Sequence, residues 1–164
     1  VCAMNNTACV IDADMFYYPK LSALLKELNT NKDARVILTP HPKELTSMLS
    51  LCGITEFDAV TQRFNAARAF AAYFPNLVLI AKGAVTYIAH GKNMFIADFG
   101  SPALAKAGSG DVLAGLSGAL LSQNYSTEEA AKTAVMAHGL ASKMQKPNYA
   151  LTPLSLIKNL EKVR

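Results

Sequence analysis

The sequence has 164 residues, of which 51% are hydrophobic and 17% are charged, and 16 basic against 12 acidic side chains give a net charge of +4. This length and apolar content indicate one folded domain and exclude an intrinsically disordered chain. The basic residues are scattered, which argues against nucleic acid as a partner, and no apolar run approaches the ~18 residues that a membrane helix needs. A mildly positive surface suits small anionic ligands such as nucleotides.

The first residues, 1–6, lack the basic and then apolar pattern of a signal peptide. Cys2, Cys9 and Cys52 have neither metal-binding nor redox spacing, so reduced thiols in a cytoplasmic protein are the simplest interpretation. We therefore expect a cytoplasmic protein that associates with neither membranes nor nucleic acid.

Apolar runs alternate with amphipathic segments along the first half of the chain. Three continuous apolar runs predict buried strands over residues 8–11, 35–39 and 77–80. Segments with helical periodicity or high alanine content predict helices over residues 20–29, 43–51 and 56–74. Gly53 stands where it would end the second of these helices.

The second half begins with a predicted β-hairpin, in which Val85 to Ala89 and Met94 to Ala97 pair across a turn that contains Gly91. Three predicted helices follow over residues 111–123, 127–144 and 154–163. Ser126 or Thr127 is the expected cap of the middle helix, with Glu129 completing a capping box, and Pro153 is expected to open the last one.

Strands that alternate with helices predict an α/β fold in which a mostly parallel sheet is covered on both faces. Ligands of such sheets bind at the carboxyl ends of the strands. The loops expected there are 12–18, 39–44 and 81–86, together with the loop 100–110 that leads into a helix.

The strongest local signal is Ala-Gly-Ser-Gly-Asp-Val-Leu-Ala-Gly at residues 107–115. Glycines at a helix N-terminus allow a phosphate to approach the backbone amides and the positive end of the helix dipole. Asp111 could accept a proton from a hydroxyl held beside that phosphate, or it could be a helix-capping acid. The spacing alone leaves both interpretations open.

Three weaker signals follow the predicted strands. In Thr-Pro-His-Pro-Lys-Glu at 39–44, His41 could donate to a polar ligand and Glu44 could hold water or a Mg²⁺ shell; alternatively, they are a loop surface residue and a first-turn acid. Lys82 and its neighbouring glycine suit nucleotide phosphates or form a plain turn. The paired acids at 12–14 could bind a metal or hydroxyls, or satisfy local amides. His90 and His138 are expected to be surface or core residues.

Taken together, these segments resemble the NAD(P)H-hydrate dehydratase family of the ribokinase-like superfamily. The resemblance covers residues 8 to 145 and depends on four segments: Val10–Asp14, Thr39–Glu44, Lys82–Thr86 and Ala105–Gly115. Sugar and vitamin kinases of the superfamily typically have Asn-x-x-Glu where this sequence has His41 and Glu44. The resemblance implies a three-layer α/β/α fold with a mostly parallel sheet and a β-hairpin.

The resemblance also implies an activity, in which ADP or ATP phosphorylates the ring hydroxyl of hydrated NADH or NADPH and loss of phosphate restores the double bond. Asp111 would be the catalytic base and would contact the hydrated nicotinamide together with His41, and Glu44 would organise Mg²⁺ through water. The expected nucleotide-binding residues are Lys82, Gly83, Ala84, Val85, Thr86, Gly108, Ser109 and Gly110. Such a lyase would work as a homo-oligomer on small molecules.

Two departures accompany the resemblance. Met15 to Tyr18 follow the Asp-Ala-Asp segment, where the family commonly has an Asn. Family domains are also longer at the N-terminal end, so residues 1–164 are expected to be one ribokinase-like domain that is N-terminally incomplete, with an exposed sheet edge. The alternatives are an ATP-dependent kinase of a small alcohol, such as a vitamin precursor, and a non-catalytic nucleotide-binding fragment.

Overall fold

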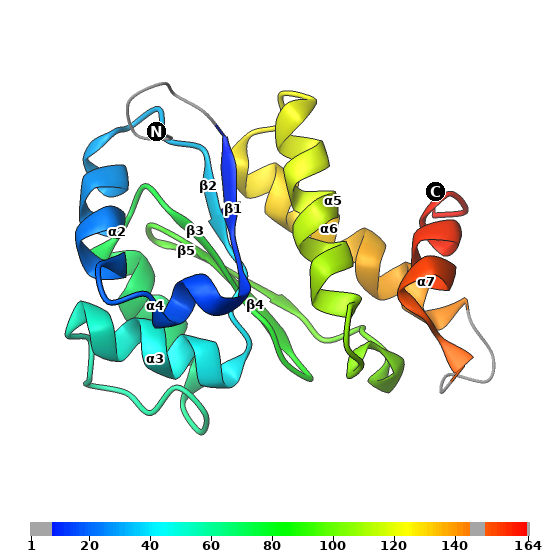
Figure 1. Ribbon diagram of the computed structural model, residues 1–164, viewed down its shortest axis with the longest axis horizontal. Coiled ribbons are helices and arrows are strands. Elements are labelled where there is room, and N and C mark those ends of the chain that lie inside the picture. The colour runs from blue at the N-terminus through cyan, green and yellow to red at the C-terminus, as the bar shows by residue number, and fades with distance from the viewer. Residues whose placement is uncertain (1–7, 145–149, 164) are drawn as a thin grey trace.

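Within residues 8–144 and 150–163, which the computed structural model describes, five strands form one mixed sheet in the order β1-β2-β3-β4-β5 (Figure 1). Their bounds are Cys9–Ile11, Val36–Leu38, Val78–Ala81, Thr86–His90 and Asn93–Ala97. The first three strands pair in parallel, and β4 is antiparallel to both of its neighbours. All strands except β4 therefore point the same way, which confirms the mostly parallel sheet with a hairpin. Cys2 and the N-terminal segment lie outside the described residues.

Helices cover both faces of this sheet, as the three-layer prediction requires (Figure 1). One face carries α2 (Leu21–Thr30), α3 (Pro42–Cys52) and α4 (Arg63–Tyr73), and the other carries α5 (Ser109–Ser122) and α6 (Thr127–Lys143). Short 3₁₀ helices span Ala13–Tyr17 and Pro102–Leu104, and α7 (Pro153–Leu160) packs on α5 and α6. No helix in this part of the chain is long and apolar enough to cross a membrane.

An apolar core lies on each face of the sheet, one under α2–α4 and one under α5–α6. This explains why the strands are continuous apolar runs and do not alternate between apolar and polar residues. Ile37 and Leu38 are adjacent and fully buried, yet Leu38 packs with the α2–α4 core and Ile37 with the α5–α6 core. Successive side chains of a strand point to opposite faces, so a sheet covered on both sides needs apolar residues at every position. Burying each such side chain contributes about 1.5–3 kcal/mol.

Helix ends follow the expected local chemistry. Ser126 caps α6 in a capping box with Glu129, and Thr152 caps α7 with Pro153 at its first position. Gly53 ends α3 with a φ of 71°, a left-handed conformation that glycine adopts without a Cβ penalty. These three features confirm the sequence-based expectations.

The predicted helix over 56–74 is wrong in its first part, because α4 begins only at Arg63. The Asp58 carboxylate accepts hydrogen bonds from the amides of Thr61 and Val60 and from the Thr61 hydroxyl, which folds this segment into a turn. The Thr61 amide contributes most to lowering the pKa of Asp58. A side chain that satisfies local amides competes with helix formation, and here it outweighs the alanine-rich pattern downstream.

Glu128 of α6 fastens the tip of the hairpin to the helix layer. Its carboxylate lies 3.0 Å from His90 Nδ1 and accepts from Asn93 at 3.0 Å and from Lys132 at 3.1 Å. Burial raises the pKa of Glu128, but these hydrogen bonds outweigh it and lower the pKa from its ordinary 4.5 to about 2. The hairpin is thus held by a carboxylate that stays ionised in the folded protein.

A Glu128→Gln variant is therefore expected to be less stable than the wild type, with a difference that depends on pH. A carboxyl group with a lowered pKa contributes stability above its unfolded-state value, here 4.5, and this contribution disappears as the pH falls towards about 2. Urea denaturation of both proteins across this window measures the difference. A difference that is constant with pH would show that the ionised carboxylate does not hold the hairpin.

Candidate active site

The ammonium of Lys82 lies where the carboxyl ends of the three parallel strands meet. Its Nζ is 3.0 Å from Oδ1 of Asp12, which follows β1, and 3.8 Å from Oε2 of Glu44, in the first turn of α3 after β2. The backbone amide of Lys82 donates to the carbonyl of Pro40 at 2.9 Å, which joins the loops after β2 and β3. Nζ also lies beside Gly110 of α5, where a Cβ would stand 3.2 Å away. One cation therefore connects four segments that are distant in sequence.

His41 and Glu44 cap α3 reciprocally. The imidazole Nδ1 accepts from the amides of Lys43 and Glu44 at 3.1 and 3.2 Å, and the Glu44 carboxylate accepts from the His41 amide at 2.7 Å. Because Nδ1 accepts, the neutral ring carries its proton on Nε2, which faces Glu44 Oε1 at 3.2 Å. Glu44 is thus an acid in the first turn of α3, as one of the two sequence-based interpretations had it. His41 is the N-cap of α3 and not the uninvolved loop residue of that interpretation.

Two constraints require glycine at position 108, before α5. Gly108 is the N-cap of α5 with a φ of 84°, and a Cβ on it would lie 2.5 Å from Cγ of Pro153 in α7. The helix begins at Ser109, two residues earlier than expected, and the Ser109 amide donates to the carbonyl of Lys106 at 3.3 Å. Asp111 lies in the first turn of α5 and is exposed.

A cavity of about 820 Å³ opens between the β3–β4 loop, the end of β5 and the facing ends of α5 and α6. This volume lies within the range of small-molecule sites. Of the predicted site residues, its lining includes His41, Lys82, Gly83, Ala84, Thr86, Ser109 and Gly110. The lining does not include Glu44, Val85, Gly108 or Asp111. Segments that carried separate sequence signals therefore share one cavity. Asp111 does not line it, but it directly follows the lining residue Gly110 in sequence.

The lining of the cavity also includes residues that the sequence analysis did not assign to a site. His138 of α6 is buried in the wall, and its Nε2 lies 2.9 Å from the carbonyl oxygen of Ser109. Burial lowers the pKa of His138, so the neutral ring donates to that carbonyl. Its neighbour Gly139 makes room for the ring of Phe99, since a Cβ there would lie 2.8 Å from Phe99 Cε2.

Helical spacing places His138 with Ala131, Ala134 and Val135 on the buried face of α6, a pattern that the sequence contains. No sequence pattern indicates that this face packs against the start of α5, so the contact with Ser109 could not be foreseen.

The carboxylates of this region do not form a protein-only metal cage. Within the described residues, no three His, Cys, Asp or Glu side chains converge in a way that could hold a metal ion. Asp12 and Glu44 instead converge on the Lys82 ammonium. This donor set fits a Mg²⁺ ion bound mainly by phosphates and water, the usual arrangement for Mg²⁺ in nucleotide sites.

Comparisons with known proteins show the family to which the chain belongs. The family model described as NAD(P)H-hydrate dehydratase matches residues 1–162. The bifunctional NAD(P)H-hydrate repair enzyme of Helicobacter pylori is 51% identical over 158 residues, which are 94% of this chain and 32% of that protein. The ADP-dependent (S)-NAD(P)H-hydrate dehydratase of Neisseria meningitidis is 36% identical over 138 residues, which are 81% of this chain and 44% of that protein. The chain thus spans less than half the length of either relative.

Solved structures show the same fold. The ADP/ATP-dependent NAD(P)H-hydrate dehydratase from Bacillus subtilis, co-crystallised with ATP/Mg²⁺ and soaked with CoA, has a TM-score of 0.69 at 30% identity, over 77% of this chain and 47% of that chain. A hydroxyethylthiazole kinase from Pyrococcus horikoshii has a TM-score of 0.70 at 21% identity, over 99% of this chain and 63% of that chain. The second likeness concerns the fold alone and shows that the α/β arrangement is shared with that kinase.

Two substitutions are expected to isolate the capping role of His41. His41→Ala should lower the free energy of unfolding by about 1 kcal/mol, because α3 loses the acceptor for its first amides. His41→Asn should recover most of that loss, since Asn is a favoured N-cap. Urea denaturation of the three proteins measures the effect, and equal stability of the Ala and Asn variants would contradict it.

Proposed function

Because this chain belongs to the NAD(P)H-hydrate dehydratase family, we propose that it dehydrates hydrated NADH or NADPH with ADP or ATP as phosphoryl donor. The observation that carries the proposal is the shared cavity, which joins His41, the loop that begins at Lys82 and the glycine turn that opens α5. We assign the nucleotide and the hydrated nicotinamide to different parts of this one cavity.

The nucleotide end of the proposed site lies between the β3–β4 loop and α5. Phe99 and Leu113 give the cavity apolar walls for a base, and Gly110 brings the first-turn amides of α5 to its lining. The Ser109 amide already donates to the Lys106 carbonyl, so the amides of Gly110 and Asp111, at the positive end of the helix dipole, are the ones that suit phosphate oxygens. Lys82, Gly83, Ala84, Val85 and Thr86 would hold the nucleotide together with Gly108, Ser109 and Gly110.

The chemical step proposed for Asp111 is general-base catalysis. The carboxylate takes the proton of the ring hydroxyl as that oxygen attacks the terminal phosphorus of the nucleotide, and the bond from phosphorus to the departing AMP or ADP breaks. The phosphate then leaves the ring carbon, a proton leaves the neighbouring carbon, and the double bond returns. The first-turn amides would stabilise the charge that develops on the transferred group. His41 would contact the hydrated ring.

Glu44 is proposed to contact the water shell of a nucleotide-bound Mg²⁺ ion, which would neutralise phosphate charge when bound. Its carboxylate already accepts from the His41 amide and faces Lys82, so its contact with the ion would be indirect, through water.

The proposal includes a cytoplasmic homo-oligomer. Met136 and Leu140 of α6 and its C-cap residue Met144 are exposed at four-residue intervals, and within the described residues they form an uncovered apolar stripe of the kind that subunit interfaces bury. It also includes one ribokinase-like domain, part of which lies outside these 164 residues. Among the described residues β1 pairs on one side only, which supports this, because further strands could pair with its other side.

The proposal is tested with the gene product that contains this sequence, using hydrated NADH, Mg²⁺ and either ADP or ATP. We expect the absorbance of reduced nicotinamide to return only when a nucleotide is present. Phosphorylation of a small alcohol without recovery of NADH would favour a kinase instead. Nucleotide binding without any turnover would favour a non-catalytic role.

Asp111→Asn is expected to lower kcat by about 10²–10⁴-fold, because the variant lacks the base that takes the hydroxyl proton. ADP binding measured by calorimetry should persist, since the backbone amides that hold phosphate are unchanged. Asp98, another exposed aspartate, supplies the matched control Asp98→Asn, which should turn over at the wild-type rate. Full activity of Asp111→Asn would show that another group is the base.

A further inference from the structure

We infer that Arg63 of α4 is a positioning residue for the loop between β3 and β4, residues 82–85. Arg63 holds this loop from the side opposite the proposed nucleotide. This inference rests on the proposed function. The Arg63 guanidinium donates through Nη2 to the carbonyl of Val85, in the middle of the loop between β3 and β4. Arg63 is 22 residues away from Val85 in sequence and belongs to another element.

The same guanidinium occupies the space behind Gly83. A Cβ at position 83 would overlap Nη1 of Arg63 and lie 2.5 Å from its Cζ, so any other residue there would displace the guanidinium. The backbone of the loop at Gly83 therefore lies directly against the arginine.

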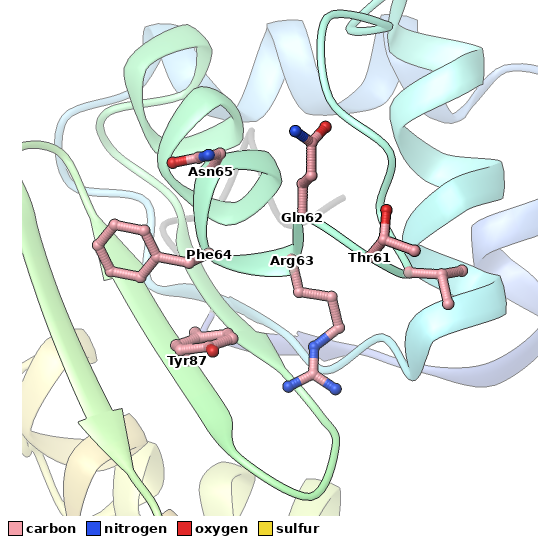
Figure 2. A pocket seen from close by; sticks show the side chains of 7 residues that line it. Thr61, Gln62, Arg63, Phe64, Asn65 and Tyr87 are labelled. Atoms are coloured by element: carbon pink, nitrogen blue, oxygen red, sulfur yellow. The ribbon is translucent and has the colours of Figure 1, made fainter.

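Tyr87 of β4 fixes the direction of the arginine side chain. The Cζ atom of Arg63 lies 5.2 Å from the centroid of the Tyr87 ring, and Phe64 meets the same ring edge-on at 5.7 Å between centroids. Figure 2 shows the Arg63 side chain reaching away from α4 beside Tyr87, with Phe64 on the other side of that ring. Within the described structure, Arg63 Nε is buried and has no hydrogen-bond partner, so the guanidinium is held by its Nη contacts and by the ring.

The loop divides the arginine from the cavity. Gly83, Ala84 and Thr86 line the cavity, whereas Val85 and Arg63 do not. Lys82, at the start of the loop, is anchored independently through the Pro40 carbonyl and Asp12. Removing the guanidinium should therefore loosen residues 83–86 and leave the Lys82 ammonium in place.

Because the loop separates Arg63 from the cavity, we expect substitutions of Arg63 to change mainly the KM for the nucleotide. Arg63→Met should raise the KM for the nucleotide about 10-fold or more, because a hydrogen bond from a charged group to the loop is lost. The KM for the hydrated nicotinamide and kcat at saturating nucleotide should stay within about 2-fold of wild type. Arg63→Lys keeps the charge and one donor, and it should recover part of the nucleotide affinity.

Gly83→Ala provides an independent test of the contact. It should raise the nucleotide KM as Arg63→Met does, because the new Cβ displaces the guanidinium. Combining the two substitutions should add little to either one alone, since both remove the same contact. Arg68→Met, on the exposed part of the same helix, removes an equal charge and should leave all parameters unchanged.

The measurements are ADP and ATP binding by calorimetry, steady-state kinetics and thermal unfolding of each variant of the complete gene product. Unchanged nucleotide binding in Arg63→Met, with an active wild type, would overturn the inference and leave the proposed function standing. A parallel loss of stability, kcat and both affinities would show a merely structural role and also overturn it. A wild-type protein that binds no nucleotide would instead refute the proposed function.

Discussion

The ammonium of Lys82 is the contact on which the candidate site depends. The parallel strands bring three loops to one edge of the sheet, but the loops carry acidic side chains that repel each other unless a cation lies between them. Lys82 supplies that cation to Asp12 and Glu44, both mostly shielded from water, where charge interactions are stronger than at the surface. Its neighbour Gly110 extends the same junction to α5. The carboxyl ends of the parallel strands and the start of α5 are thereby held together as one unit.

Buried contacts from outside the loops support this junction on two sides. From the α5–α6 layer, the neutral imidazole of His138 holds the carbonyl of Ser109 and fixes the first turn of α5. From the α2–α4 layer, Arg63 holds the carbonyl of Val85 and fixes the loop after β3. Both side chains donate to a backbone carbonyl of a segment that lines the cavity. The two helical layers thus serve the site as well as the cores, because each contributes one donor to a backbone carbonyl beside the cavity.

Sequence reasoning recovered the parts of this arrangement that depend on local chemistry. Apolar runs identified the strands, and the capping residues Gly53 and Ser126 set helix ends within a residue or two. The same reasoning failed over residues 56–62, where the Asp58 side chain satisfies amides that a helix would have used. His138 and Arg63 were missed for a different reason. Their contacts join elements that are distant in the chain, and no periodicity or motif in one segment reveals its neighbour in another.

The charges of Lys82, Asp12 and Glu44 indicate which groups would hold the phosphates of a bound nucleotide. A strand-end lysine suggests a direct phosphate ligand, but Lys82 already faces two carboxylates within 4 Å, and with both ionised this group of three carries one net negative charge. Under the proposed function, attraction for an anionic nucleotide would come largely from the amides at the start of α5 and from the helix dipole, to which Gly110 gives close access. Lys82 shapes the edge of the sheet and offsets its acids, while the glycine turn presents the electropositive surface.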